Sequence, residues 1–337
     1  MRLGLGVVAL IACARGAAAR SAQTSSAPLV RAGTIELPGV DGRIDHLAVD
    51  LARERLFLAA LGNDSVEVVD LRAGKHLRSL PGASEPQGIA YLADCDRIVV
   101  ANGGSGACDV YDGATLERTA RVEVGADADN VRYDARAKRV YVAFGEGALG
   151  VVDAASWKVV ERIALTGHPE SFQLDAQGKS AWVNVPDAGA LVRVDLEARK
   201  VVATVRLDEA RANFPLAWVP PDSSAPEGRL LVGCRSPAKL LVRDAKSGAK
   251  LAALELSGDT DDVFYDARRR RAYAVCGAGS IDVFADDERD GLRALARVAS
   301  APGARTGLFV PERERLFVAV PRRDGQRAEV TIFTVQD

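Results

Sequence analysis

The sequence lacks the features that most often assign a function directly. Its 337 residues carry 44 basic and 46 acidic side chains, a formal net charge of −2, so no global positive field is present to recruit nucleic acid. It has no P-loop, no zinc motif and no recognisable Ser-His-Asp arrangement. Helical periodicity of useful length is also missing. Composition therefore indicates a soluble globular chain but compels no particular chemistry.

Long hydrophobic runs are missing too. The apolar segment LGLGVVALIACA after Arg2 is too short to span a bilayer, and small residues follow it in ARGAAARSAQTSS. This order is that of a secretory signal, with an A-x-A cleavage region near residues 17–19. Alternatively, LIAC at residues 10–13 resembles a bacterial lipobox, which would leave Cys13 as a lipid anchor. Either alternative predicts a mature chain in the periplasm or outside the cell.

Cysteine is scarce beyond this leader, where four remain: Cys95, Cys108, Cys234 and Cys276. An even count in an exported protein permits disulfides. Cys95 precedes one expected strand and Cys108 opens its antiparallel partner, which places the two thiols near opposite ends of the pair and out of bonding range. Cys234 and Cys276 share a register in neighbouring repeats and so are possible partners. The favoured interpretation is small buried thiols that are mostly unbridged.

A repeat of about 40 residues is the strongest feature that is present. Short strands such as RLFLAA and RVYVAF begin at Arg55, Arg97, Arg139, Ser180, Arg229, Arg271 and Arg315. An equivalent segment precedes each, beginning at Asp45, Gln87, Asp129, Glu170, Phe214, Asp261 and Arg305. A third and a fourth strand follow in each repeat. Four short β-branched strands in each of seven repeats predict an all-β fold, a seven-bladed β-propeller with antiparallel blades.

The ends of the chain predict how this ring closes. The last repeat stops after its third strand, whereas the segment GTIELPGV from Gly33 to Val40 has the form of an outer strand. We therefore expect the N-terminal segment to complete the last blade and protect its edge. Residues 1–28 are then a signal peptide and flexible linker, and 29–337 form a single propeller. The stretch PPDSSAPEG is interpreted as a lengthened hairpin loop in the fifth blade.

The segment AKRVYVAFGEGALGVVDAASWKVVERI resembles the YVTN-type repeats of bacterial exported propellers, similar to the YncE family. The resemblance covers nearly the whole mature chain and implies an exported seven-bladed propeller. It is specific for architecture and uninformative about function, because the same blades carry many unrelated activities. Related propellers include redox-enzyme subunits, but the sequence has no haem motif such as C-x-x-C-H and no tryptophan-derived cofactor signature.

Polar residues concentrate where each repeat leads into its first strand, as in GADADN and GDTDDV. In a propeller these loops meet at one mouth of the central channel, so we predict a polar funnel there. Its candidate ligand-binding residues are Asp45, His46, Glu85, Gln87, Asp127, Asp129, Asn130, His168, Glu170, Arg211, Asn213, Asp259, Asp261, Asp262 and Arg305. Asp and Asn also brace turns without any ligand. However, the residues differ from blade to blade, which is typical of a site carried by a rigid scaffold.

The opposite mouth is expected to carry basic turns, with Arg268 to Arg271 as the densest run. A solvated turn explains this run, and it is too local to indicate nucleic-acid binding. His76 is expected at the surface of an outer strand, and the three tryptophans are expected to serve packing.

Three functions remain open. The leading hypothesis is a non-catalytic propeller that binds a small polar ligand, an ion or an envelope protein at the funnel. The alternative is a metal-dependent hydrolase, lactonase or lyase, with Ca²⁺ or Mg²⁺ on the channel axis and His46 or His168 as the base. Its possible metal ligands are Asp129, Asn130, Glu170, Asp261 and Asp262. The third is a structural scaffold. Arg43, Arg211 and Arg305 are the candidates to compensate the acids, and arginines that pair with the acids would instead favour a polar metabolite.

Overall fold

The computed structural model describes residues 1, 27–145, 147–223, 225–287, 291–323 and 325–337. The predicted signal segment and Cys13 lie outside the described residues. No helix in the described part of the chain is long and apolar enough to cross a membrane.

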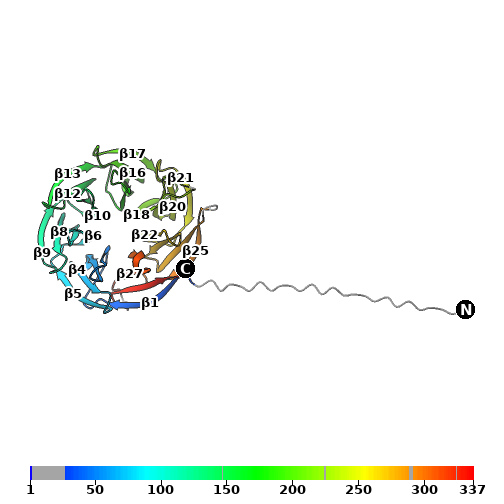
Figure 1. The fold of residues 1–337 in the computed structure, drawn as a ribbon, viewed down its shortest axis with the longest axis horizontal. Coiled ribbons are helices and arrows are strands. Elements are labelled where there is room, and N and C mark those ends of the chain that lie inside the picture. Colours follow the sequence, from blue (N-terminus) through cyan, green and yellow to red (C-terminus); the bar gives the residue numbers. More distant parts are fainter. Residues whose placement is uncertain (2–26, 146, 224, 288–290, 324) are drawn as a thin grey trace.

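The described strands form seven four-stranded antiparallel sheets that are arranged in a ring, as predicted (Figure 1). From the channel outward, blades 1 to 4 are β2 (Leu47–Asp50), β3 (Arg55–Ala60), β4 (Ser65–Asp70), β5 (Lys75–Pro81); β6 (Pro86–Leu92), β7 (Arg97–Asn102), β8 (Ala107–Asp112), β9 (Arg118–Glu123); β10 (Ala128–Asp134), β11 (Arg139–Phe144), β12 (Ala148–Asp153), β13 (Lys158–Ala164); and β14 (Phe172–Leu174), β15 (Ser180–Val185), β16 (Ala190–Asp195), β17 (Lys200–Arg206). Blades 5 to 7 are β18 (Arg211–Val219), β19 (Arg229–Ser236), β20 (Ala238–Asp244), β21 (Lys250–Glu255); β22 (Thr260–Asp266), β23 (Arg271–Cys276), β24 (Ser280–Asp287), β25 (Gly291–Ala299); and β26 (Thr306–Val310), β27 (Arg315–Val320), β28 (Glu329–Val335), β1 (Leu29–Glu36). Short 3₁₀ turns occupy η1 (Leu61–Asn63), η2 (Pro186–Ala188) and η3 (Pro311–Arg313).

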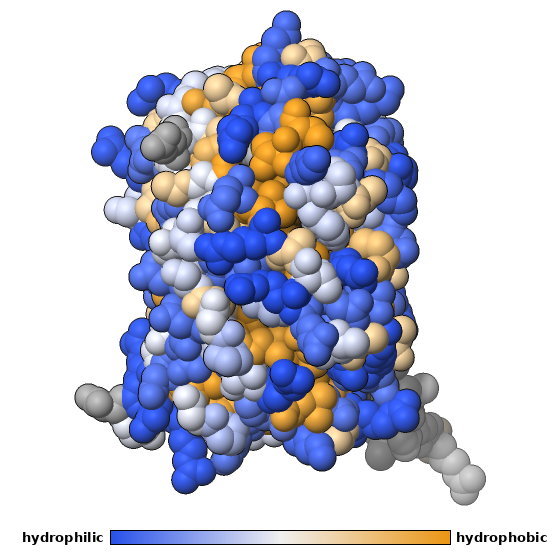
Figure 2. All heavy atoms as spheres, turned by 90° about the vertical axis from the view of Figure 1, so that its left-hand side faces the viewer, coloured by the Kyte–Doolittle hydropathy of each residue, from blue (hydrophilic) through white to orange (hydrophobic). Residues whose placement is uncertain are grey.

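The position of a strand within its blade decides its sequence pattern. The second strands, such as β3 and β11, are buried on both faces and read as continuous apolar runs. The outer strand β17 alternates between exposed and half-buried residues, because one of its faces meets solvent. Figure 2 shows the resulting outer wall, which is mainly hydrophilic with narrow hydrophobic strips.

The hydrophobic core is divided among the interfaces between blades. Seven clusters of buried residues each combine side chains of two neighbouring blades. Between blades 1 and 2, for example, the rings of Phe57 and Tyr91 lie 6.0 Å apart. Trp182 is fully buried between blades 4 and 5, which agrees with its expected packing role. Each blade is therefore stabilised mainly by its two neighbours.

The N-terminal strand closes the ring as predicted, although it begins at Leu29, four residues before the expected Gly33. It pairs antiparallel with β28, from Leu29 opposite Val335 to Glu36 opposite Glu329. Leu29 packs into the cluster between blades 6 and 7, whereas Ile35 packs into the cluster between blades 7 and 1. The strand thus contributes apolar contacts on both sides of the last blade.

The turns of the opposite mouth do not form a bare basic surface. Arg269 donates to Glu314 at 2.9 Å, and Arg268 pairs with the same carboxylate. Arg270 pairs with Asp222 and Asp286 at 3.2 and 3.3 Å. Mutual ion pairing therefore compensates these charges, in line with the expectation of ordinary surface turns. PPDSSAPEG forms part of the connection between β18 and β19, as expected for a lengthened hairpin loop.

His76 departs from its prediction. Its side chain is only 15% exposed, and Nε2 lies 2.6 Å from Oε2 of Glu67, a carboxylate that is fully buried in β4. His76 thus joins Ser65 and Ser79 in satisfying the buried carboxylate of Glu67.

All four described cysteines are free thiols, so no disulfide joins Cys234 to Cys276 or Cys95 to Cys108. Cys95 is exposed, which corrects the expectation of a buried thiol at that position. Burial raises the pKa of Cys108, Cys234 and Cys276 to about 12.

We expect alkylation to distinguish these thiols, because only an exposed sulfur can form the reactive thiolate. Iodoacetamide added to the native protein without reductant should label Cys95 and leave the three buried cysteines unmodified, as measured by peptide mass spectrometry. After unfolding in denaturant, all four should be labelled. Recovery of any of them as a disulfide-linked peptide would contradict the structure.

The closure of the ring by β1 can be tested by truncating one buried aliphatic side chain. Ile35→Ala should lower the free energy of unfolding by about 2 to 5 kcal/mol, because it leaves a cavity between blades 7 and 1. Thr34→Ala is the matched control: its side chain is exposed on the same strand, so the change should stay within about 0.5 kcal/mol. Urea unfolding curves compare the two, and equal effects would show that β1 does not seal the ring.

Candidate functional site

The polar funnel is built where the inner strands depart from regular pairing. In blade 3, Ala128 pairs with Phe144 and Val131 with Val142, so Asp129 and Asn130 form a bulge. Blade 6 has the same irregularity between Thr260 and Asp262. A bulge re-aims side chains without ending the strand. It therefore turns acidic residues toward the channel mouth.

The loops before these bulges take a left-handed turn. Glu85, Asp127 and Asp259 occupy equivalent positions in three blades, with φ values of 48°, 52° and 61°. The carbonyl of Asp259 accepts a hydrogen bond from Gly277 at 2.8 Å, and a Cβ on Gly277 would lie 2.2 Å from Oδ2 of Asp259. The main chain of this turn is therefore held against the following hairpin, and a left-handed conformation of this kind is one that Asp tolerates. The conformation also sets where the carboxylates of these acids point.

Arginines compensate the acids on one side of the funnel. Arg43 donates to Asp45 at 2.8 Å, and Arg305 lies 3.0 Å from Asp261 and 3.1 Å from Asp259. Arg235 lies 2.6 Å from Asp261. Burial raises the pKa of Asp261 and Arg235 opposes that rise, which leaves the pKa at about 6. This arginine side, formed by blades 5, 6, 7 and 1, is close to electrically balanced.

Arg235 is a site residue that sequence reasoning missed. It lies near the end of β19, the second strand of blade 5, and its guanidinium also lies 3.9 Å from the ring centroid of Phe214. The available signal was its position: strand β19 extends past the point where the other second strands end. The predicted compensating arginine of this blade, Arg211, is exposed and pairs along the backbone with Ser236.

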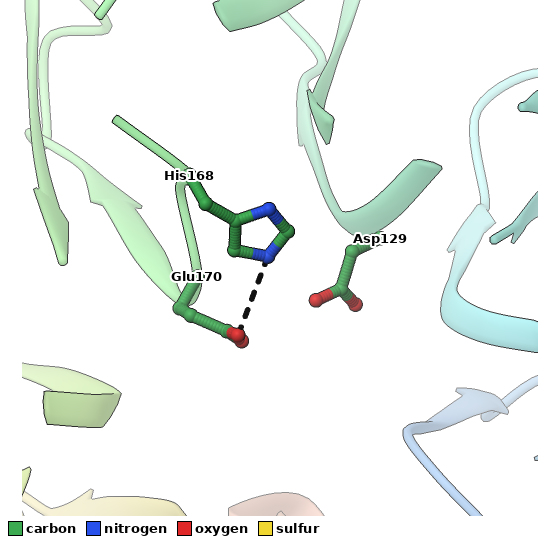
Figure 3. A group of neighbouring side chains, drawn as sticks. All are labelled: Asp129, His168 and Glu170. Atoms are coloured by element: carbon green, nitrogen blue, oxygen red, sulfur yellow. Dashed lines mark ion pairs between the residues drawn. The ribbon is translucent and has the colours of Figure 1, made fainter. Parts of the chain in front are cut away.

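On the opposite side of the funnel, no arginine of the described residues forms an ion pair with the acids. Asp129 from β10 faces His168 and Glu170 from the loop before β14 (Figure 3). His168 Nε2 lies 3.4 Å from Glu170 Oε1, and Nδ1 lies 3.7 Å from Asp127. The hydrogen bond with Glu170 raises the pKa of His168 to about 9 despite partial burial. Burial, reinforced by Glu170 and Asp45, raises the pKa of Asp129 well above its ordinary value.

A cavity of about 210 Å³ lies in the channel and is lined by six of the seven blades. Its walls are His46, Leu47, Gly88, Ile89, Arg132, Gln173, Asp262, Phe264, Gly307 and Leu308. Gly88 leaves room for the next blade, because a Cβ there would lie 2.1 Å from the carbonyl oxygen of Asp129. Polar and apolar groups therefore share one small enclosed volume.

His46 in this cavity is an ion-pair partner. Burial lowers its pKa, but the Asp262 carboxylate 3.5 Å from Nδ1, helped by Asp45 and Asp129, outweighs that effect and raises the pKa to about 10. Asp262 also accepts a hydrogen bond from the backbone of Gly307 at 2.9 Å. At neutral pH the pair is therefore imidazolium and carboxylate.

Arg132 is the second cavity residue that sequence reasoning missed. Its guanidinium donates to the carbonyl of Val131 at 2.9 Å and to Ser171 Oγ at 3.3 Å, and it lies 5.4 Å from the ring centroid of Phe172. No carboxylate in the described part of the chain lies within ion-pair distance of it. Burial lowers its pKa, and the carboxylates of Asp262 and Asp129, which act at longer range, oppose that effect. The equivalent residue is alanine in blades 1, 2 and 5. This difference between the repeats could have identified Arg132 from the sequence.

Several predicted residues have other roles. Gln87 donates to Asp127 at 3.0 Å, so both lie at the mouth, where Glu85 is exposed. Asn213 is not at the mouth: it is fully buried and donates to Asn184 and to the carbonyl of Ala190.

Two of the proposed metal ligands are already engaged, because Asp261 pairs with arginines and Asp262 with His46. Asn130 is buried beside Asp129, and its Oδ1 accepts no hydrogen bond from the described residues. Only Asp129 and Glu170 of that predicted set come together in one group, and His168 joins them.

The His46 pair predicts a pH-dependent contribution to stability. Because its folded pKa lies near 10 and its ordinary value is 6.5, the stabilisation is complete below pH 6.5 and is lost as pH rises toward 10. His46→Gln should therefore cost about 2 to 4 kcal/mol at pH 6.5 and progressively less up to pH 10. Urea unfolding of both proteins across this range checks it, and a gap that stays constant with pH would rule out a charged His46.

No protein-family model matches the chain, and no curated protein matches it in sequence. Among solved structures, a chain of Kuenenia stuttgartiensis hydrazine synthase aligns with a TM-score of 0.75 and 16% identity over 88% of this chain and 98% of that chain. A chain of a mitotic checkpoint complex aligns with a TM-score of 0.77 and 14% identity over 99% and 100%. At these identities the likeness shows the fold alone. The chain is thus a seven-bladed β-propeller, a fold that suits binding.

Proposed function

We propose that this protein is an exported, non-catalytic β-propeller that binds a small anionic ligand, carrying a carboxylate or phosphate group, in the channel cavity. The single observation behind the proposal is Arg132. Its half-buried guanidinium forms no ion pair with a carboxylate of the described residues, although Asp262 and Asp129 act on it at longer range, and a bound anion would supply the missing close partner. Arginine is also well suited to carboxylates and phosphates, because its planar fork donates two parallel hydrogen bonds.

The surroundings of Arg132 support the same ligand chemistry. His46 adds a second positive group to the wall, although Asp262 already neutralises it. Leu47, Ile89 and Phe264 give the rest of the cavity an apolar surface. A cavity of about 210 Å³ is smaller than the ~300–1,000 Å³ of most pockets for drug-sized ligands. The ligand is therefore a small metabolite or ion.

A metal-dependent hydrolase that uses the same funnel is less well supported. Both candidate bases carry raised pKa values, about 10 for His46 and about 9 for His168. A general base works best with a pKa close to the working pH, and these imidazoles are already protonated at pH 7. Export remains part of the proposal and rests on the signal-like segment alone.

Arg132→Met tests the proposal with two readouts of opposite sign. The variant removes a half-buried charge that forms no ion pair with the described residues, while it keeps apolar bulk, so the ligand-free protein should melt at the same or a higher temperature. At the same time it should lose the stabilisation by anions. In wild type, a bound anion at a hundred times its Kd should add about 2.7 kcal/mol of stability.

Thermal unfolding with acetate, succinate, inorganic phosphate and, as a cationic control, ethylamine measures these effects. Arg78→Met is the matched control, because Arg78 is exposed on the outer strand β5 and should leave the anion response unchanged. The proposal is wrong if none of the anions stabilises the wild type. It is equally wrong if Arg132→Met responds to them as the wild type does.

A further inference from the structure

The uncompensated side of the funnel brings three potential metal ligands together. Asp129 projects from the bulge of β10, and His168 and Glu170 project from the loop that leads into β14 (Figure 3). One ligand atom from each residue lies within 4.8 Å of the others. Two carboxylates and one imidazole from adjacent blades therefore point at a common volume.

Asp129 supplies an independent observation that points to a cation. The residue is only 6% exposed, yet its Oδ1 accepts no hydrogen bond from the described residues. Buried carboxylate oxygens are normally satisfied, and an unpaired one is expensive. Figure 3 shows this carboxylate directed toward His168 and Glu170. This carboxylate, one of whose oxygens is unsatisfied, therefore faces the volume that the other two ligands share.

The distribution of charge around the funnel sets this group apart. On the arginine side, Arg43, Arg235 and Arg305 lie within ion-pair distance of the acids. Among the described residues, no lysine or arginine lies within that distance of Asp129 or Glu170, and His168 is the one basic partner of Glu170. The fold itself provides a cation for one set of carboxylates and leaves the other set to be neutralised from solution.

We propose that Asp129, His168 and Glu170 form a binding site for a divalent transition metal ion, with Zn²⁺ or Mn²⁺ as the class that fits. Imidazole nitrogen favours such metals over Mg²⁺ and Ca²⁺, which prefer oxygen ligands alone. Metal–ligand bonds of about 2.0–2.2 Å place two ligand atoms at most ~4.4 Å apart. The ligand atoms here lie within 4.8 Å of one another, so small side-chain rotations would bring them to bonding distance from one ion. Three protein ligands leave at least one coordination position open toward the mouth.

This site is distinct from the anion cavity, because none of its three residues lines that cavity. Its occupancy does not depend on the proposed function. Because the positive charge of Arg132 acts on the Asp129 carboxylate, Arg132→Met should bind the metal at least as tightly as wild type, and this separates a failure of one proposal from a failure of the other.

Isothermal titration of ZnCl₂, MnCl₂, MgCl₂ and CaCl₂ into chelator-treated, untagged protein tests the site. We expect one Zn²⁺ or Mn²⁺ per chain, and tighter binding of these ions than of Mg²⁺ or Ca²⁺. Asp129→Asn and Glu170→Gln should each weaken the Kd at least tenfold, since even the loss of an outer-shell partner costs roughly 10–100-fold. His168→Gln should weaken Zn²⁺ most and abolish the preference over Ca²⁺.

Asp259→Asn is the matched control, because it removes a funnel carboxylate from the arginine side and should leave metal affinity within twofold of wild type. Asp129→Asn keeps the shape of a side chain with an unsatisfied oxygen, so without metal it should melt no lower than wild type. The proposal is overturned by absence of Zn²⁺ and Mn²⁺ binding, by unchanged affinity in Asp129→Asn, by equal losses in Asp259→Asn, or by tighter binding of Ca²⁺ than of Zn²⁺.

Discussion

Apolar packing between neighbouring blades is the constraint on which the rest of this structure depends. Each blade is a thin sheet that cannot bury both of its faces alone, so its stability comes from the two blades beside it. Such an arrangement is complete only as a closed ring, which explains why β1 carries buried residues toward both flanking interfaces. Closure in turn forces seven inner strands toward one axis, where space is limited and no further strand can pair with them. Polar side chains with few partners are the result.

The channel resolves this crowding differently on its two sides. On the arginine side, arginine side chains form ion pairs with the acids, so the protein itself neutralises the local charge. On the side of blades 3 and 4, Asp129 and Glu170 share only a histidine. In the channel cavity, Arg132 forms no ion pair with the described carboxylates, although Asp262 and Asp129 act on it at longer range. Buried charges of opposite sign that are close but not paired are costly to keep, and their separation is the main physical reason to regard this region as functional.

Local patterns were enough to predict the architecture. Strand β3 begins at Arg55 and β27 at Arg315, as their β-branched and apolar runs indicated, and closure by an N-terminal strand followed from a missing outer strand. The residues of the site were harder to predict from the sequence, because the site depends on contacts between blades. Asn213 was misplaced because it is equivalent to Ala128 and Thr260, which pair with the second strand just before the bulge and are buried. Arg235 and Arg132 lie within strands. Hydrophobic periodicity in a strand predicts which face is buried, but it does not predict which residue a long side chain contacts.

The antiparallel pairing of β1 with β28 has a mechanical consequence. Leu29 lies opposite Val335, so the start of the first strand and the end of the last one leave the ring at the same point (Figure 1). Tension applied between these two ends acts across the ladder and not along it, and it opens the hydrogen bonds one after another, as in peeling a strip. A chain that is attached only at its N-terminal end carries no force that separates β1 from β28. Attachment at one end is therefore compatible with an intact ring. If both ends were attached to partners that move apart, a low force would separate β1 from β28 and open the ring.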